Sequence, residues 1–380
     1  MDKETLYMMA LTRVPKLNFS QQRTLVETLG SATAVYENRN NILDIIPDAA
    51  TALKENLSFM DSCLPRCEEE LEWAEKVKVD CISFLDTRYP QRMKECDDAP
   101  MMLYYRGTAD LNKTRIVSMV GTRKITDYGR QMCEIFIREL AELCPDALVM
   151  SGLAYGVDIQ CHRQAMQNKM ETIGVLAHGL DQIYPTLHRN TAKEMVCQGG
   201  LLTEFMSRTT IEKRYFVQRN RIVAGCSDAT IVVESASRGG SLITAEIAQS
   251  YGKEVYAFPG RMTDSQSDGC NRIIANNTAG LLICAEDFVN AMGWQNDKAR
   301  QKQLADGVQQ DLFPEISDEE QLIVETLRNK DRLQLNVISV STGIPAGRLS
   351  GLLFTMEMKG IVRMIPGGMY RLNRTKLHTE

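Results

Sequence analysis

The 380-residue sequence contains few aromatic residues and no long apolar run. Aromatic residues make up only 6% of the chain, so an aromatic side chain set among cations is informative. No stretch approaches the roughly 18 apolar residues that span a bilayer, so we expect no membrane segment. The first residues include Asp2, Lys3 and Glu4 instead of the apolar core of a secretion signal, which predicts a cytoplasmic protein.

The sequence also lacks the patterns of a disulfide framework, a metal site or a strongly basic surface. Its 11 cysteines stand at irregular spacing in a long chain, and reduced buried thiols explain them better than disulfides do. Cys63 and Cys67 have no second cysteine pair or histidine pair beside them, which disfavours zinc. Because the net charge is −5, any nucleic-acid site must be a local basic patch.

The spacing of apolar residues divides the chain into three folded regions and a linker. Helical periodicity marks residues 1–75, where the turn at 14–20 resembles a helix-hairpin-helix unit but has no glycine to hold phosphate, so a structural hairpin is favoured. Alternating strands and helices over 80–293 predict an α/β, Rossmann-like parallel sheet covered on both faces. The polar residues 294–316 predict a linker. Three helices and a hairpin over 317–374 predict a winged helix, with protein contact favoured over DNA reading.

Ligands in open α/β sheets bind beyond the carboxyl ends of the strands, so the loops that follow the strands are the candidate sites. The expected core strands are Ile116–Val120, Ala147–Ser151, Thr172–Ala177, Leu201–Phe205, Ala229–Glu234, Glu254–Phe258 and Leu281–Cys284.

The loop after the first of these strands contains Gly121, Thr122 and Arg123. It lacks the G-x-G-x-x-G pattern, and the next strand ends in Ser151 and Gly152 instead of an acidic residue. A nicotinamide cofactor is therefore disfavoured, and we expect no cofactor. A binding loop and a plain solvated loop both stay open for this segment.

Asp158 and His162 stand four residues apart and would share one face of a helix. Such a pair can perform acid–base chemistry, but a helix-start carboxylate and a hydrogen-bonded histidine are the favoured interpretation. We therefore expect no catalytic residue.

Glycines also precede the helix that follows the fifth strand. Gly239, Gly240 and Ser241 stand at its N-terminus, where free N–H groups and the helix dipole favour an anion, and Thr244 adds a hydroxyl. Phosphate suits this loop, which does not distinguish a nucleotide from a nucleic acid. A structural N-cap is the alternative.

A charged helical segment after the fourth strand favours a nucleic acid over a free nucleotide. It places Phe216 among Lys213, Arg219 and Arg221, with the amide of Asn220 available for a base edge. An aromatic ring among cations suits an unpaired strand, because every base has a face to stack. A buried Phe216 beneath a solvated helix is the alternative.

Taken in order, these motifs resemble the DNA processing protein A (DprA/Smf) family. The matching pieces are Val120–Arg123, Tyr128–Gly129, Ser151–Asp158, His162, Gly179–Asp181, Tyr184–Pro185, Arg219–Gly225, Gly240–Ala245, Phe258–Gly260 and Gly269–Asn271. Residues 206–210 depart from the family, which usually has proline and glycine there. The rival interpretation is a nucleotide-processing enzyme of the phosphoribohydrolase (LOG) type, which would need no extended cationic track.

The resemblance implies a protein without catalytic activity that binds single-stranded DNA. It also implies loading of the RecA recombinase onto strands coated by single-strand-binding protein, a role in natural transformation, and a homodimer formed through Ile273, Ile274 and Leu281. The DNA-binding positions that it implies are Gly121, Thr122, Arg123, Ser151, Gly152, Lys213, Phe216, Arg219, Asn220, Arg221, Gly239, Gly240, Ser241 and Thr244.

Overall fold

The computed structural model describes residues 2–46, 52–295, 317–329, 333–359, 361–365 and 369–372. The chain forms two compact units, Met1–Asn296 and Asp297–Glu380. All but the first two residues of the predicted linker at 294–316 lie outside the described residues.

A nine-stranded sheet, in the order β1-β2-β6-β5-β4-β3-β7-β8-β9, forms the centre of the described part of the first unit. Its parallel strands are β6 (Gly199–Thr203), β5 (Glu171–Val175), β4 (Leu148–Ser151), β3 (Ile116–Val120), β7 (Ala229–Val232), β8 (Glu254–Ala257) and β9 (Gly280–Leu281). The α/β class is confirmed. At one edge β1 (Asp80–Ser83) and β2 (Met102–Gly107) add antiparallel pairs that the strand pattern did not predict.

The order of the parallel strands reverses at β3. From β3 the chain passes through β4, β5 and β6 on one side, and then returns to β7, β8 and β9 on the other. The loops that leave β3 and β7 therefore diverge, and such a switch point opens a crevice at the carboxyl edge of a parallel sheet.

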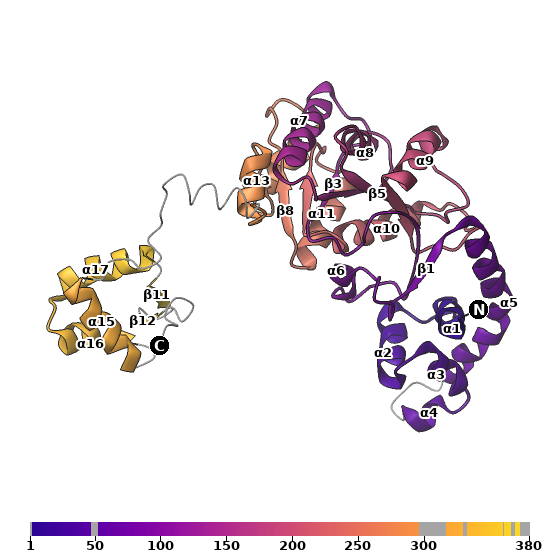
Figure 1. Ribbon diagram of the computed structural model, residues 1–380, viewed down its shortest axis with the longest axis horizontal. Helices are drawn as coiled ribbons and strands as arrows, with labels where there is room; N and C mark the ends of the chain where they lie inside the picture. Colours follow the sequence, from indigo (N-terminus) through magenta and orange to yellow (C-terminus); the bar gives the residue numbers. More distant parts are fainter. Residues whose placement is uncertain are drawn as a thin grey trace. The chain divides into compact units, whose positions relative to one another are not determined.

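Helices cover both faces of this sheet, as Figure 1 shows. One face carries α7 (Asp127–Leu143), α8 (Val157–Gln167) and α13 (Ala285–Ala291), and the other carries α10 (Lys213–Gly225) and α11 (Gly240–Ser250). The remaining elements of the core are α6 (Gln91–Lys94), a 3₁₀ turn at Thr186–His188, α9 (Arg189–Cys197) and α12 (Asp268–Ala275).

The β3 strand shows why both faces need cover. Val117 and Met119 belong to the buried cluster beneath α7, whereas Ile116 and Val120 belong to the cluster on the opposite face. Since successive side chains of a strand point to opposite faces, an apolar run such as this one requires a helix layer on each side.

The N-terminal helices share the core of the sheet. They are α1 (Lys3–Thr12), α2 (Phe19–Leu29), α3 (Ala32–Glu37), α4 (Ile42–Ile45) and α5 (Ala52–Val77). Met8 and Met9 are buried in the same apolar cluster as Met101 and Leu103. At the predicted hairpin, Asn18 begins α2 with a capping box to Gln21, which fixes where the helix starts.

The second unit contains α15 (Asp318–Asn329), α16 (Leu335–Thr342) and α17 (Ala346–Met358) with a small antiparallel sheet. The sheet order is β10 (Leu333–Gln334), β12 (Met369–Leu372) and β11 (Val362–Ile365). This combination of helices and a small sheet is as predicted, while the predicted turn at 366–368 lies outside the described residues.

Among the described helices, none alone is long and apolar enough to cross a bilayer. By length and composition, the bent pair of α16 and α17 would qualify together.

A buried ion pair joins α10 to the strand edge beside the N-terminal helices. The Arg221 and Glu204 side chains are 6% and 5% exposed and form a direct salt bridge. Arg221 also donates to the Asp98 carbonyl and lies 4.2 Å over the Phe19 ring of α2. Removing one partner of such a pair leaves an uncompensated buried charge.

We therefore predict that Arg221→Met lowers the free energy of unfolding by about 3–5 kcal/mol. The matched control is Arg208→Met, which removes a pair with Glu69 that is 69% and 56% exposed, and should cost less than about 1 kcal/mol. Urea unfolding followed by tryptophan fluorescence reports this unit alone, because Trp73 and Trp294 both lie within it. Equal losses in the two variants would contradict the buried-pair interpretation.

Candidate nucleic-acid interface

A cleft of about 250 Å³ opens at the switch point between β3 and β7. It is lined by segments that the chain brings from the β3 loop, the start of α8, the middle of α10 and the start of α11. The lining residues are Val120, Gly121, Thr122, Arg123, Ala154, Asp158, Phe216, Val217, Arg219, Asn220, Gly239, Gly240, Ser241, Ile243 and Thr244.

The loops that follow β3 and β4 touch each other at this cleft. Val157 donates its backbone N–H to the Thr122 carbonyl at 3.2 Å. Gly156 has a φ of 79°, and a Cβ there would lie 2.1 Å from the same carbonyl oxygen. Glycine is therefore required at 156 by both the backbone conformation and the close approach.

Glu234, two residues after the end of β7, fixes the other side of the β3 loop. Its carboxylate accepts from the Thr126 N–H at 2.9 Å and from the Thr126 hydroxyl at 2.6 Å. Its carbonyl accepts from the Thr122 N–H at 2.7 Å. The loop is therefore held at both ends before any ligand binds.

Arg219 lies beneath the cleft and is only 4% exposed. One guanidinium nitrogen donates to the carbonyls of Gly152 and Val175, at the carboxyl ends of β4 and β5. Burial lowers the pKa of Arg219, and the Asp158 carboxylate opposes that change. The Arg219 Nε donates to the Asn220 side-chain oxygen at 3.2 Å, so Arg219 is a buried support of the cleft.

The rim of the cleft is aromatic and cationic. The Arg123 guanidinium lies 5.7 Å from the centre of the Phe216 ring, within cation–π range. Phe216 also meets Tyr184 edge to face, with ring centroids 5.8 Å apart. Phe216 is half-buried, so one ring combines a protein contact with a surface that a base can reach.

The start of α11 forms the opposite wall. A Cβ added at Gly240 would meet no described atom within 4 Å, so the space above this helix terminus is open. The Ser241 hydroxyl donates to the Ser235 hydroxyl at 2.9 Å, which ties the first turn to the end of β7. Free N–H groups at such a terminus suit a phosphate.

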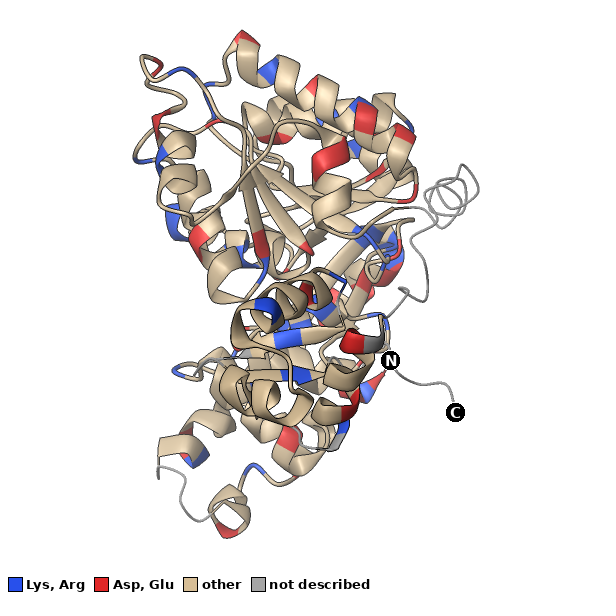
Figure 2. Cartoon of the chain, turned by 90° about the vertical axis from the view of Figure 1, so that its left-hand side faces the viewer, with Lys and Arg blue, Asp and Glu red and all other residues tan. Residues whose placement is uncertain are grey.

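Exposed cations surround this cleft although the chain is acidic overall. Arg123, Lys124, Lys213 and Arg238 are exposed, and none of them forms an ion pair within the described residues. Elsewhere Lys and Arg alternate with Asp and Glu along the helices, as Figure 2 shows. The positive charge needed for an anionic ligand is therefore local.

The family model for the DNA recombination-mediator protein A family matches residues 80–293, which is more than half of the chain. This chain belongs to that family. The resemblance inferred from the ordered motifs is confirmed.

Several proteins of the DNA recombination-mediator protein A family are similar to the chain in sequence or structure. DNA processing protein DprA of Streptococcus pneumoniae is 37% identical over 212 residues, 56% of this chain and 74% of that protein. Its crystal structure matches with a TM-score of 0.64 and 31% identity over 75% of this chain and 97% of that one. DNA processing protein A of Helicobacter pylori, which has a single-stranded DNA binding mode, matches with a TM-score of 0.51 and 30% identity over 57% and 95%.

The structure brings most of the site residues predicted for this family member into one cleft. Ser151 and Gly152 lie just behind it, with the Ser151 hydroxyl donating to the Met119 carbonyl at 2.6 Å. Lys213 is exposed at the first residue of α10, outside the lining. Ile273 and Ile274 lie on α12 and Leu281 on the edge strand β9, where Leu281 is 51% exposed.

Arg221 lies away from the cleft, and its position corrects the prediction that it contacts DNA there. It lies on a different face of α10 from the cleft, buried in its pair with Glu204. Tyr155 and Tyr184 border the small cavity that adjoins the cleft, although neither was among the predicted DNA-binding residues. Both follow strands at the carboxyl edge, so the rule that found the glycine loops would have found them.

Asp158 and His162 are not arranged as an acid–base pair. His162 is fully buried and its Nδ1 lies 2.7 Å from the Thr172 hydroxyl, while Asp158 accepts from the Ala154 N–H at 3.3 Å. Burial is the main reason that the pKa of His162 falls to about 3. The imidazole is therefore neutral near pH 7.

This burial gives the protein a stability that depends on pH. Below the unfolded pKa of about 6.5, the unfolded chain binds a proton at His162 and the folded chain does not, so stability falls by up to about 1.4 kcal/mol per pH unit down to the folded value. We predict that His162→Gln flattens the loss of unfolding free energy between pH 6.5 and 4.5, as measured by tryptophan fluorescence. A comparison at pH 8, where the imidazole is neutral in both states, isolates the packing cost. Parallel pH profiles for parent and variant would refute the assignment.

Proposed function

We propose that the protein binds single-stranded DNA in the switch-point cleft and that it does so without catalytic activity. The observation that carries this proposal is the meeting of Arg123, Phe216 and the glycine turn before α11 around one opening. Membership of the recombination-mediator family and the similarity to a single-stranded DNA binding protein of Helicobacter pylori support it.

The two halves of the cleft suit the two parts of a nucleotide. Open N–H groups at the start of α11 and the exposed Arg123 suit phosphates, which supply the affinity that depends on salt. The half-buried Phe216 ring and the nearby Tyr184 suit the face of a base. Bases in a duplex are already stacked and paired, so their faces cannot reach this rim.

The proposal extends to assembly and recombination. In it the bound strand, coated by single-strand-binding protein, is passed to a RecA-type recombinase during natural transformation, and two chains associate through Ile273, Ile274 and Leu281. The family description as a recombination mediator supports transfer, and the exposed Leu281 on an edge strand supports association. Strand exchange by RecA on coated DNA, with and without the protein, tests the transfer.

The first binding prediction concerns the stacking of a base on the Phe216 ring. Phe216→Ala should weaken oligothymidine binding by about 1–3 kcal/mol while its salt dependence stays constant, because an uncharged stacking surface is removed. Phe59→Ala, at a ring 49% exposed on α5, is the matched control and should bind as the parent does. Fluorescence anisotropy with single-stranded and duplex probes in one buffer provides the measurement. A parent that binds both forms equally would refute the proposed function.

Phosphate contact gives the second binding prediction. Arg123→Gln should reduce the slope of log affinity against log salt by roughly 0.7 for one lost contact with a single strand. Lys169→Gln is the control, since Lys169 is exposed just before β5, at the amino edge of the sheet. Titrations with oligothymidine at several salt concentrations measure both slopes. An unchanged slope in Arg123→Gln would remove this residue from the site.

A further inference from the structure

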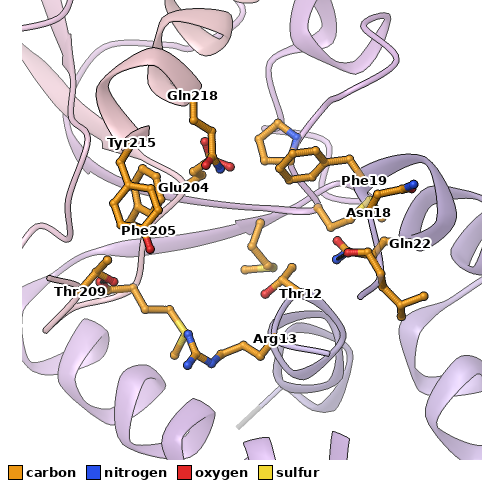
Figure 3. A pocket seen from close by; sticks show the side chains of 15 residues that line it. Thr12, Arg13, Asn18, Phe19, Gln22, Glu204, Phe205, Thr209, Tyr215 and Gln218 are labelled. Atoms are coloured by element: carbon orange, nitrogen blue, oxygen red, sulfur yellow. Dashed lines mark hydrogen bonds between the residues drawn. The ribbon is translucent and has the colours of Figure 1, made fainter. Parts of the chain in front are cut away.

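A second cavity, of about 330 Å³, lies between the N-terminal helices and the core, on a different face of α10 from the cleft. Figure 3 shows its walls. Phe205 and Tyr215 lie together on one side, while Phe19 and Gln22 of α2 face them from the other. A volume of this size is typical of small-ligand sites.

Two buried acceptors in this cavity have no donor. Gln22 is 4% exposed, and its Nε2 donates to the Leu17 carbonyl at 3.2 Å, which identifies the other amide atom as oxygen. That Oε1 has no hydrogen-bond partner within the described residues. Glu204 Oε1 has none at hydrogen-bond geometry among these residues either, while its sister oxygen pairs with Arg221. Burial raises the pKa of this carboxyl, and the neighbouring Gln218 side chain acts to lower it. Buried acceptors left without donors are costly, so donors from a ligand are the natural completion.

The other walls are aromatic. The Phe205 and Tyr215 rings lie with centroids 4.5 Å apart, and both are half-buried. Phe19 is also half-buried, with the Arg221 guanidinium stacked over its ring. A flat ligand that carries N–H donors on its edge would satisfy the acceptors and the rings together.

We propose that this cavity takes a nucleobase, and guanine in particular, with its amino group on Gln22 and its ring N–H on Glu204. Guanine is the base that presents two adjacent kinds of donor on one edge. This inference rests on the proposed function, because a strand leaving the cleft across the start of α10 would pass Lys213 and Arg214, both exposed. The guanine in the cavity then belongs to the bound strand. A free guanine nucleotide would present the same donors and is the alternative occupant that the test distinguishes.

The test compares oligothymidine with two strands that carry interspersed dG or interspersed deoxyinosine, which lacks only the amino group. The dG strand should bind the full-length protein about three- to tenfold more tightly than the inosine strand, the worth of one hydrogen bond to a buried acceptor. Gln22→Met removes the side-chain oxygen that accepts from the amino group and should abolish this difference in affinity. Gln22→Glu keeps an accepting oxygen and should retain the difference. Neither change should alter oligothymidine binding.

Tyr215→Leu keeps the test decisive if Gln22→Met fails to fold. It removes a half-buried ring and should weaken both purine strands while oligothymidine binding is unchanged. If added dGMP abolishes the preference for the dG strand, a free guanine nucleotide also occupies the cavity. If dGMP has no effect, the cavity takes a base only from the bound strand. Equal affinity for dG and inosine strands in the parent, a preference that survives Gln22→Met, or purine strands that bind Tyr215→Leu as tightly as the parent would overturn the base pocket. Failure of oligothymidine itself to bind would instead overturn the proposed function.

Discussion

The Arg219 guanidinium lies almost fully buried where the carboxyl ends of β4 and β5 meet, bonded to the carbonyls of Gly152 and Val175. A buried charge persists only when polar partners replace water, and here two carbonyls and the Asp158 carboxylate do so. Burial raises the pKa of Asp158 while Arg219 opposes the rise, so the two groups stabilise each other's charge. The loops of the cleft therefore surround a buried guanidinium whose position is fixed by these partners.

Helix α10 serves two surfaces because its residues point in different directions. Phe216 and Asn220 line the cleft, whereas Tyr215 and Gln218 line the second cavity. At the start of the helix, Lys213 and Arg214 are exposed and precede both sets in the chain. The N-terminal helices complete the second cavity. Their packing against the sheet therefore shapes this proposed binding cavity as well as stabilising the fold.

The sequence predicted which loops line the cleft better than it predicted where individual side chains lie. Loops after β3 and β7 were identifiable because ligands bind at the carboxyl edge of such sheets and because glycines mark close approach. Arg219 and Arg221 were grouped by proximity, but residues two apart on a helix do not share a face, so only one reaches the cleft. The strands β1 and β2 were not predicted because they pair antiparallel outside the strand–helix alternation.

The central claim is that a single strand occupies the switch-point cleft, and amide hydrogen exchange tests it most directly. The exchange of backbone amides would be compared in the free protein and in the complex with oligothymidine. We predict slowed exchange at residues 121–124, 152–157 and 236–242, with no change at the amino edge of the sheet around Lys169. Protection confined to the second unit, with these loops exchanging as in the free protein, would contradict it.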